Sequence, residues 1–196
     1  HSDKISHKLE LAAHEKPFLD MLWQWQTYRR EIYNMVKIFR TIDNNVHQIN
    51  EAQEGSWIAL IDPTATEIVE IAEKYDIDVD HLRAPLDEEE RSRIEAEDEY
   101  TLILVDIPSI EERNGKDWFV TIPMAIITTK DMLITVCLEE TPILTAFMDG
   151  RVRDFHTFMK TRFILQILYK NATQYLQYLR IIDKKSAVSY THLRAH

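Results

Sequence analysis

The sequence predicts an α/β (α+β) domain in which a mixed β-sheet is sandwiched between helices. Two observations lead to this prediction. Short apolar runs rich in β-branched residues alternate with segments of helical periodicity, and proline or turn residues separate these runs. A chain of 196 residues is long enough for one such domain with a sizeable core.

Three strands are predicted before the first helix. Residues 36–42 form the first, and the turn residues Asp43-Asn-Asn45 lead into a short second strand at 46–49. Trp57–Ile61 is the third. It should end at Asp62-Pro63, because proline lacks the donor that a strand ladder requires.

A helix is predicted directly after the third strand. Its start carries a capping box, Thr64-Ala-Thr-Glu67, which satisfies two amide donors at a helix N-terminus. Ile68, Ile71, Ala72 and Tyr75 follow at helical spacing and give the helix one buried face. A second short helix is expected through His81, Leu82 and Leu86.

The second half of the chain adds three strands and a short helix. Residues 100–107 read as a strand ended by Pro108, and a polar loop at 111–117 connects it to a strand at 118–128. A turn at 129–131 then joins that strand to 132–138, so the two should form a hairpin. A short helix is expected from Pro142 to about Asp149-Gly150.

The last predicted helix carries a seam of apolar residues at 3-4-3-4 spacing, which lies on one side of a helix. The seam comprises Leu165, Leu168, Ala172, Tyr175, Leu179 and Ile182, beside a stripe of Ile164, Ile167, Tyr178 and Ile181. A face this broad needs partners on more than one side. Two interpretations stay open: packing on the sheet within the domain, or contact with further helices or subunits.

Composition excludes some classes of function. The net charge of −10 argues against a nucleic-acid binder, which needs basic patches. A single cysteine, Cys137, cannot form an internal disulfide and is expected to be a buried small hydrophobe in a reducing cytoplasm. The apolar runs are shorter than the roughly 20 residues of a membrane helix, so we expect the chain by itself to be soluble.

Both ends are interpreted as additions to a domain at 35–186. Residues 1–34 carry five basic and five acidic residues, and Met35 immediately precedes the first strand. We interpret 1–34 as a non-native or disordered extension; the alternative is an amphipathic segment whose Trp23 and Trp25 pack on the domain. Residues 187–196 lie beyond the apolar helical pattern, resemble translated adapter sequence, and are interpreted as an artefactual tail.

Three segments in order resemble the soluble cytoplasmic domain of the CorA-type magnesium transporter family. They are Trp57-Ile-Ala-Leu-Ile-Asp-Pro-Thr64, Asp87-Glu-Glu-Glu-Arg-Ser-Arg-Ile-Glu95, and Phe119-Val-Thr-Ile-Pro-Met-Ala-Ile-Ile127 with Leu133-Ile-Thr-Val136. The resemblance covers residues 36–186. It implies a regulatory domain of a homopentameric magnesium or cobalt channel, at the cytoplasmic face of the cell membrane.

In that family a stalk helix leads into the membrane, and Gly-Met-Asn marks the pore. No Gly-Met-Asn occurs in this sequence. We therefore expect a fragment truncated before its stalk and pore, with its own stalk and transmembrane region as partner and no direct membrane insertion by the fragment itself.

The resemblance also implies a regulatory Mg²⁺ site of carboxylates between neighbouring domains. The family's acidic Leu-Glu-Asp stretch corresponds here to Leu82-Arg83-Ala84, in which both acids are missing. Asp87 and Glu88 lie close by and are the candidate metal ligands, because Mg²⁺ prefers oxygen and binds paired carboxylates loosely. The alternative is a solvated helix N-terminus, where acids favour the helix dipole.

No other constellation predicts an enzyme. Three glycines do not suffice for a phosphate-cradling loop, and no serine has a nucleophile-elbow context. His81 and His156 have no cysteine or carboxylate partner at structural-zinc spacing. Two alternatives to the magnesium or cobalt assignment stay open: a stand-alone acidic scaffold or interaction domain of the same fold, and a zinc-transporting family variant.

Overall fold

The computed structural model describes residues 36–193, with side chains to residue 186. The described residues all lie in one compact unit, which spans residues 35–196. The predicted N-terminal extension therefore lies outside the described residues. Its nature and that of the predicted tail stay predictions.

A seven-stranded mixed sheet forms the centre of the described unit, with strand order β2-β1-β3-β7-β6-β5-β4. Neighbouring strands are antiparallel except β3 and β7, which are parallel. The strands are β1 (Val36–Ile42), β2 (Asn45–Ile49), β3 (Trp57–Ile61), β4 (Arg93–Ala96), β5 (Tyr100–Arg113), β6 (Lys116–Thr129) and β7 (Leu133–Cys137).

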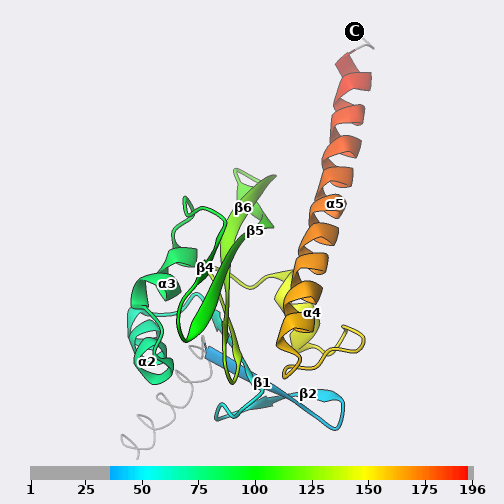
Figure 1. Ribbon diagram of the computed structural model, residues 1–196. Helices are drawn as coiled ribbons and strands as arrows, with labels where there is room; N and C mark the ends of the chain where they lie inside the picture. The colour runs from blue at the N-terminus through cyan, green and yellow to red at the C-terminus, as the bar shows by residue number, and fades with distance from the viewer. Residues whose placement is uncertain (1–35, 194–196) are drawn as a thin grey trace, which may run out of the picture. The chain divides into compact units, whose positions relative to one another are not determined.

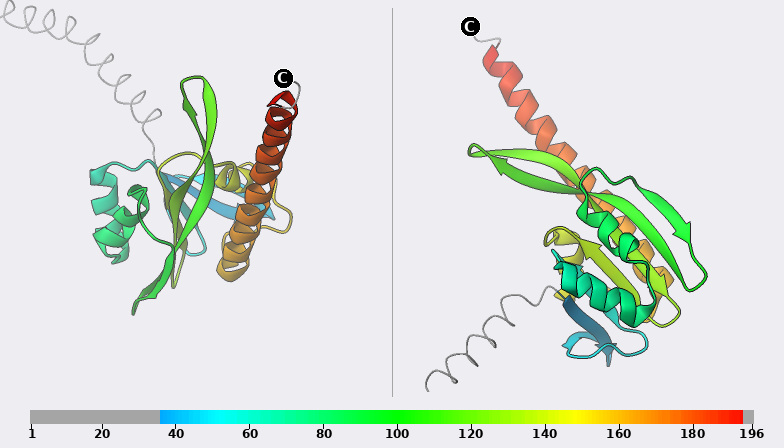
Figure 2. Two further views of the ribbon diagram at one scale, coloured as in Figure 1. Left: turned by 90° about the horizontal axis from the view of Figure 1, so that it is seen from above. Right: turned by 90° about the vertical axis from the view of Figure 1, so that its left-hand side faces the viewer.

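Helices cover both faces of this sheet (Figures 1 and 2). On one face lie α2 (Ala65–Tyr75), α3 (Val79–Arg83) and the short 3₁₀ helix η1 (Ala84–Leu86); on the other lie α4 (Pro142–Met148) and α5 (Lys160–Leu193). The predicted fold class, a mixed sheet sandwiched between helices, is confirmed.

Strand β3 shows how the sequence builds two cores. Side chains alternate across a strand, so Trp57, Ala59 and Ile61 join the core under α4 and α5, while Ile58 and Leu60 join the core under α2 and α3. All five residues are buried, which is typical of a strand covered on both faces.

The predicted capping box is present at the start of α2. The Glu67 amide donates to Thr64 Oγ1 over 3.3 Å, and the Thr64 amide donates to Glu67 Oε2 over 2.8 Å. At the other end, Asp76 adopts the left-handed conformation, with φ of 52°, and ends the helix. These local signals place both ends of α2 within one helical turn of the predicted ends.

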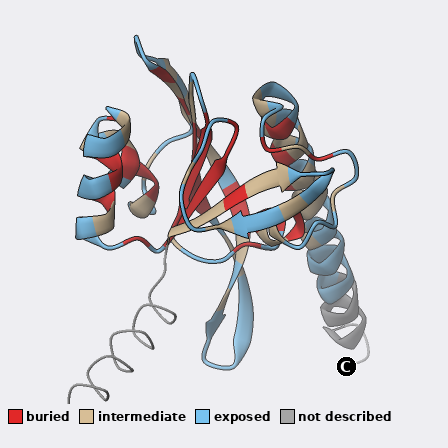
Figure 3. Ribbon diagram, turned by 90° about the horizontal axis from the view of Figure 1, so that it is seen from below, coloured by how far each residue is buried: buried red, intermediate tan, exposed pale blue. Residues whose placement is uncertain are grey.

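The segment 111–117, predicted as a polar loop, is instead the tip of a long hairpin. Both strands continue into it, and Asn114 and Gly115 alone make the turn, with φ of 53° and 71°. Two consecutive positive φ values suit the twist of a two-residue hairpin, and the Asn-Gly pair adopts them readily. The polar side chains here coat an exposed two-stranded arm (Figure 3).

The prediction that Pro108 ends its strand is wrong, because β5 runs on to Arg113. Two residues earlier, the Asp106 amide points away from β6 and donates to Ser92 Oγ over 3.1 Å. Alternation places the Pro108 nitrogen on the same side, beyond the last β4 pair at Leu104. Proline therefore removes no bond from the β5–β6 ladder.

Helix α5 packs on the sheet through a different stripe from the predicted seam. Phe163, Ile167 and Asn171 are buried, whereas Leu165 is 62% exposed and Leu179 is 53% exposed. Asn171 Nδ2 donates to the Asp106 carbonyl over 2.9 Å, at the edge of β5 that β4 leaves open. Packing within the domain is thus confirmed, and part of the seam faces solvent. The helix continues past Ser186, where the apolar pattern stops.

Across the part of the chain that the structure describes, no helix combines the length and apolar character needed to cross a bilayer.

Candidate metal-binding sites

The acidic run after η1 forms a turn, so the alternative of a helix N-terminus is wrong. The Asp87 amide donates to the Ala84 carbonyl over 3.2 Å, and Asp87 Oδ1 accepts from the Glu89 amide over 3.0 Å. The Asp87 carboxylate therefore has a structural partner in its own turn. Asp87, Glu88 and Glu89 are exposed, and Glu90 forms an ion pair with Arg93.

The two predicted metal ligands differ in their surroundings. Glu88 and Glu89 line a groove of about 580 Å³ beside α5, whereas Asp87 is not among its lining residues. Tyr175 and Leu179 of α5 line the same groove. Glu88 thus lies beside an apolar face of α5.

The position that corresponds to the family's acidic stretch offers no metal ligand. Leu82 and Ala84 are buried in the core under α2 and α3. Arg83 is exposed and lies 3.9 Å from Asp80, three residues earlier on the same helix. A cation would meet a guanidinium at this point of α3.

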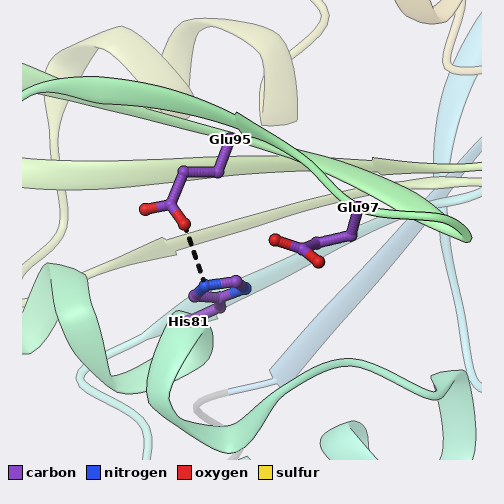
Figure 4. A group of neighbouring side chains, drawn as sticks. All are labelled: His81, Glu95 and Glu97. Atoms are coloured by element: carbon purple, nitrogen blue, oxygen red, sulfur yellow. Dashed lines mark ion pairs between the residues drawn. The ribbon is translucent and has the colours of Figure 1, made fainter.

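Helix α3 brings His81 to two carboxylates, which lie outside the structural-zinc spacings considered in the sequence. His81 Nε2 lies 3.4 Å from Glu95 Oε2. The possible ligand atoms of His81, Glu95 and Glu97 all lie within 4.8 Å of one another (Figure 4). The sequence interval of 14 and 16 residues hid this group, because sequence motifs for metal sites rest on short spacings.

Four elements position these side chains. His81 comes from α3, Glu95 from β4 and Glu97 from the turn in which its amide donates to the Tyr100 carbonyl over 2.9 Å. The carboxylates of Glu95 and Glu97 both lie near His81, so both side chains reach toward α3. Tyr100 begins β5, and its hydroxyl lies 2.7 Å from His81 Nδ1.

Local electrostatics fix the charge of two of these groups. A hydrogen bond from Arg93 lowers the pKa of Glu95, so this carboxylate is ionised at neutral pH. The same bond raises the pKa of Arg93. Burial raises the pKa of Tyr100, so its hydroxyl stays protonated and can donate or accept. The group therefore offers one imidazole nitrogen and two carboxylates, of which Glu95 is held by Arg93.

Comparison with solved structures shows the same fold in transporter domains. The soluble domain of CorA from Methanocaldococcus jannaschii matches with a TM-score of 0.68 and 20% identity, over 82% of this chain and 65% of that one. The complete CorA magnesium transporter of the same organism matches with a TM-score of 0.67 and 17% identity, over 83% of this chain. This chain spans 52% of that transporter's length.

A third structure, the ZntB cytoplasmic domain from Vibrio parahaemolyticus, matches with a TM-score of 0.61 and 11% identity, over 76% of this chain and 62% of that one. A search of curated protein sequences found no significant match.

The sequence model of one family, described as CorA-like Mg²⁺ transporter protein, matches residues 52–187. This range includes β3, both helical layers and every residue of the two candidate sites. It covers more than half of the chain, and the solved structures share the fold. The chain belongs to the CorA-like Mg²⁺ transporter family.

Proposed function

We propose that this chain is the cytoplasmic regulatory domain of a magnesium or cobalt transporter. The observation that carries the proposal is the family match over residues 52–187. It is supported by the likeness of the whole described fold to the soluble domain of a CorA protein. The pore that moves the ion is not among the described residues.

The domain is proposed to act through contacts with further helices and with copies of itself in a homopentamer. Exposed apolar residues on α5 support this step, because Leu165, Leu176 and Leu179 are each more than half exposed. A continuous apolar helix face gains free energy when a partner covers it. In the proposed assembly the stalk, the transmembrane region or a neighbouring subunit supplies that cover.

Mg²⁺ is proposed to regulate the assembly through Asp87 and Glu88. Both are exposed, and Glu88 lines the groove beside α5, where another element can approach. Mg²⁺ keeps several of its waters and binds one or two carboxylates, so a ligand from a neighbouring domain would complete the site. Bound ions would screen like charges and stabilise the closed state, and their loss would favour opening.

Isothermal titration calorimetry of the full chain with Mg²⁺ tests the regulatory site. The Asp87→Ala/Glu88→Ala variant should lose millimolar binding, because both oxygen ligands are removed. Asp98→Ala/Glu99→Ala is the matched control, since it removes two adjacent exposed acids from the β4–β5 turn. Equal Mg²⁺ binding by the two double variants would exclude Asp87 and Glu88.

Transport is tested with a chimera that places residues 36–186 before the stalk and pore of the M. jannaschii CorA. Uptake of Mg²⁺ or Co²⁺ into liposomes should fall when Mg²⁺ is present on the cytoplasmic side. Uptake that does not respond to Mg²⁺ on that side would favour the scaffold alternative. The zinc-transporting alternative, which the match to the ZntB domain fits, predicts regulation by Zn²⁺ in the same assay.

A further inference from the structure

We propose that His81, Glu95 and Glu97 form a binding site for a divalent transition-metal ion of the zinc, cobalt or nickel class. The site lies within one chain, between α3 and the β4–β5 hairpin (Figure 4). It differs in position and ligand chemistry from the candidate Mg²⁺ ligands Asp87 and Glu88, and it does not depend on the proposed function.

The first argument is the geometry of the ligand atoms. Two donors about 2.1 Å from a tetrahedral ion lie roughly 3.4 Å apart, and His81 Nε2 and Glu95 Oε2 are separated by 3.4 Å. That separation is long for a direct N–H···O hydrogen bond, whose usual length is about 2.9 Å. A carboxylate oxygen of Glu97 lies within 4.8 Å of a possible ligand atom of His81 and of Glu95, and the exposed Glu97 side chain can close the remaining gap.

The second argument is the support behind the imidazole. Tyr100, 8% exposed, places its hydroxyl 2.7 Å from His81 Nδ1 and accepts the Asp78 amide over 3.2 Å. With a metal on Nε2, Nδ1 carries the proton and donates to the hydroxyl oxygen. A histidine that ligates a metal almost always has such a partner on its second nitrogen, which fixes the tautomer and the ring orientation.

The third argument is the orientation of β4. Arg93 and Glu95 point toward the α3 side, while Ile94 lies on the opposite side and is 71% exposed. Burial of apolar area alone would favour the reverse orientation, since a shift of one residue exchanges the two faces of a strand. Strand β4 thus places charged side chains opposite His81 and leaves Ile94 exposed to solvent.

The fourth argument is charge. Arg93 pairs with Glu90 and with Glu95 Oε1, which leaves Glu95 Oε2 directed at His81. Glu97 adds a third carboxylate beside Glu95 and His81. Three carboxylates and one guanidinium carry a formal charge of about −2, which a divalent ion would neutralise. An imidazole nitrogen favours zinc, cobalt or nickel over Mg²⁺, which prefers oxygen. Three protein ligands leave a coordination position for water, which suits exchangeable binding.

Titration of the full chain with Co²⁺, followed by its visible absorption and by competition with Zn²⁺, tests the site. All proteins carry His192→Ala/His196→Ala, which removes a histidine pair with ligand spacing in the tail. His81→Gln and Glu97→Gln should each weaken Co²⁺ binding by about tenfold or more, since each removes a ligand. Glu99→Gln, with the same charge change two residues from Glu97, should leave the affinity unchanged.

Circular dichroism without metal checks that each variant is folded. If His81→Gln is unfolded, the exposed Glu97 decides the question alone. Equal Co²⁺ affinity in Glu97→Gln and Glu99→Gln would overturn the proposal, and so would displacement of Co²⁺ by equimolar Mg²⁺. Asp87→Ala/Glu88→Ala should keep Co²⁺ binding, so failure of the Mg²⁺ site and failure of this site are distinguishable.

Discussion

Trp57 is the centre of an aromatic cluster under α4 and α5. Its ring lies 5.0 Å from the ring of Phe39 and 5.0 Å from that of Phe163, measured between centroids. Its one polar atom, Nε1, donates to Thr135 Oγ1 over 2.9 Å. Both residues are fully buried, so this hydrogen bond cannot be replaced by one to bulk water.

The variant Thr135→Val should therefore destabilise the domain. It keeps the side-chain volume but leaves the indole N–H without an acceptor, at a cost of about 1–3 kcal/mol. Urea denaturation followed by tryptophan fluorescence measures the change in the free energy of unfolding. Thr135→Ser, which keeps the hydroxyl, is the control and should lose less. A Thr135→Val variant as stable as the wild type would show that the hydrogen bond contributes nothing to stability.

Cys137 supplies a prediction about pH. Burial raises the pKa of its thiol from 9.0 to about 12. The unfolded thiol ionises first, so this group's stabilisation of the native state is complete below pH 9 and is lost as pH rises toward 12. The free energy of unfolding of the wild type should approach that of Cys137→Ala between pH 9 and 11. A difference in the free energy of unfolding between the wild type and Cys137→Ala that stays constant from pH 9 to 11 would contradict this prediction.

The capping box of α2 and the group around His81 differ in how far they can be predicted from the sequence. The Thr64–Glu67 box could be predicted because both partners lie within one helical turn and the chemistry needs no third element. His81 has its partners 14 and 16 positions away, and they meet only after the chain turns back through β4. No spacing rule identifies such a group before the register of β4 is known.

At the scale of elements, α5 has one buried stripe and one exposed stripe. The helix contacts the sheet through Phe163 and Ile167, while Leu165 and Leu179 are exposed. Periodicity predicted a broad apolar face correctly. It did not show which part of that face meets the sheet, because residues at 3-4 spacing on either stripe satisfy the same helical pattern.

Leu165→Gln/Leu179→Gln should reduce self-association of the chain at high concentration without lowering its stability much, because exposed side chains contribute little to folding. Sedimentation velocity over a concentration series measures association. Ile167→Ala is the contrast: it removes a buried side chain and should cost about 2–5 kcal/mol. A wild type that stays monomeric throughout would refute the prediction of self-association.

Strand β4 could not be predicted from its pattern. Arg93 and Glu95 alternate with Ile94 and Ala96, but the charged side chains face the helical layer. The usual rule places apolar residues toward the core, so the segment reads as a polar elbow. The same reversal that hid the strand provides the carboxylates of the proposed site.

For the whole molecule, the structure predicts that residues 36–186 fold without the flanking segments. Both hydrophobic clusters consist of residues within this range. The thermal midpoint of 36–186 should lie within about 4 °C of that of the full chain, a shift that corresponds to about 1–2 kcal/mol. A larger decrease, measured by circular dichroism, would show that the ends stabilise the domain.

The fold class was predictable at this scale because alternating strands and amphipathic helices restrict a chain of this length to few layer arrangements. The strand order was not. Strand β3 (Trp57–Ile61) pairs with β7 (Leu133–Cys137), which is far away in the sequence. A strand buried on both faces could equally pair with a strand next to it in the sequence, so the burial pattern of β3 does not identify its partner.

The parallel pair of β3 and β7 has a consequence for synthesis of the protein. Strand β7 lies at the centre of the sheet but is the last strand in the sequence. Roughly 70 residues separate it from β3. At about 5–20 residues per second, the ribosome needs roughly 4–14 s to supply it. During that interval the edge of β3 lacks its partner, and Ile58 and Leu60 lack the neighbours that later bury them. The unpaired edge of β3 can meanwhile pair with another polypeptide, so the nascent chain needs protection at this edge until β7 is made.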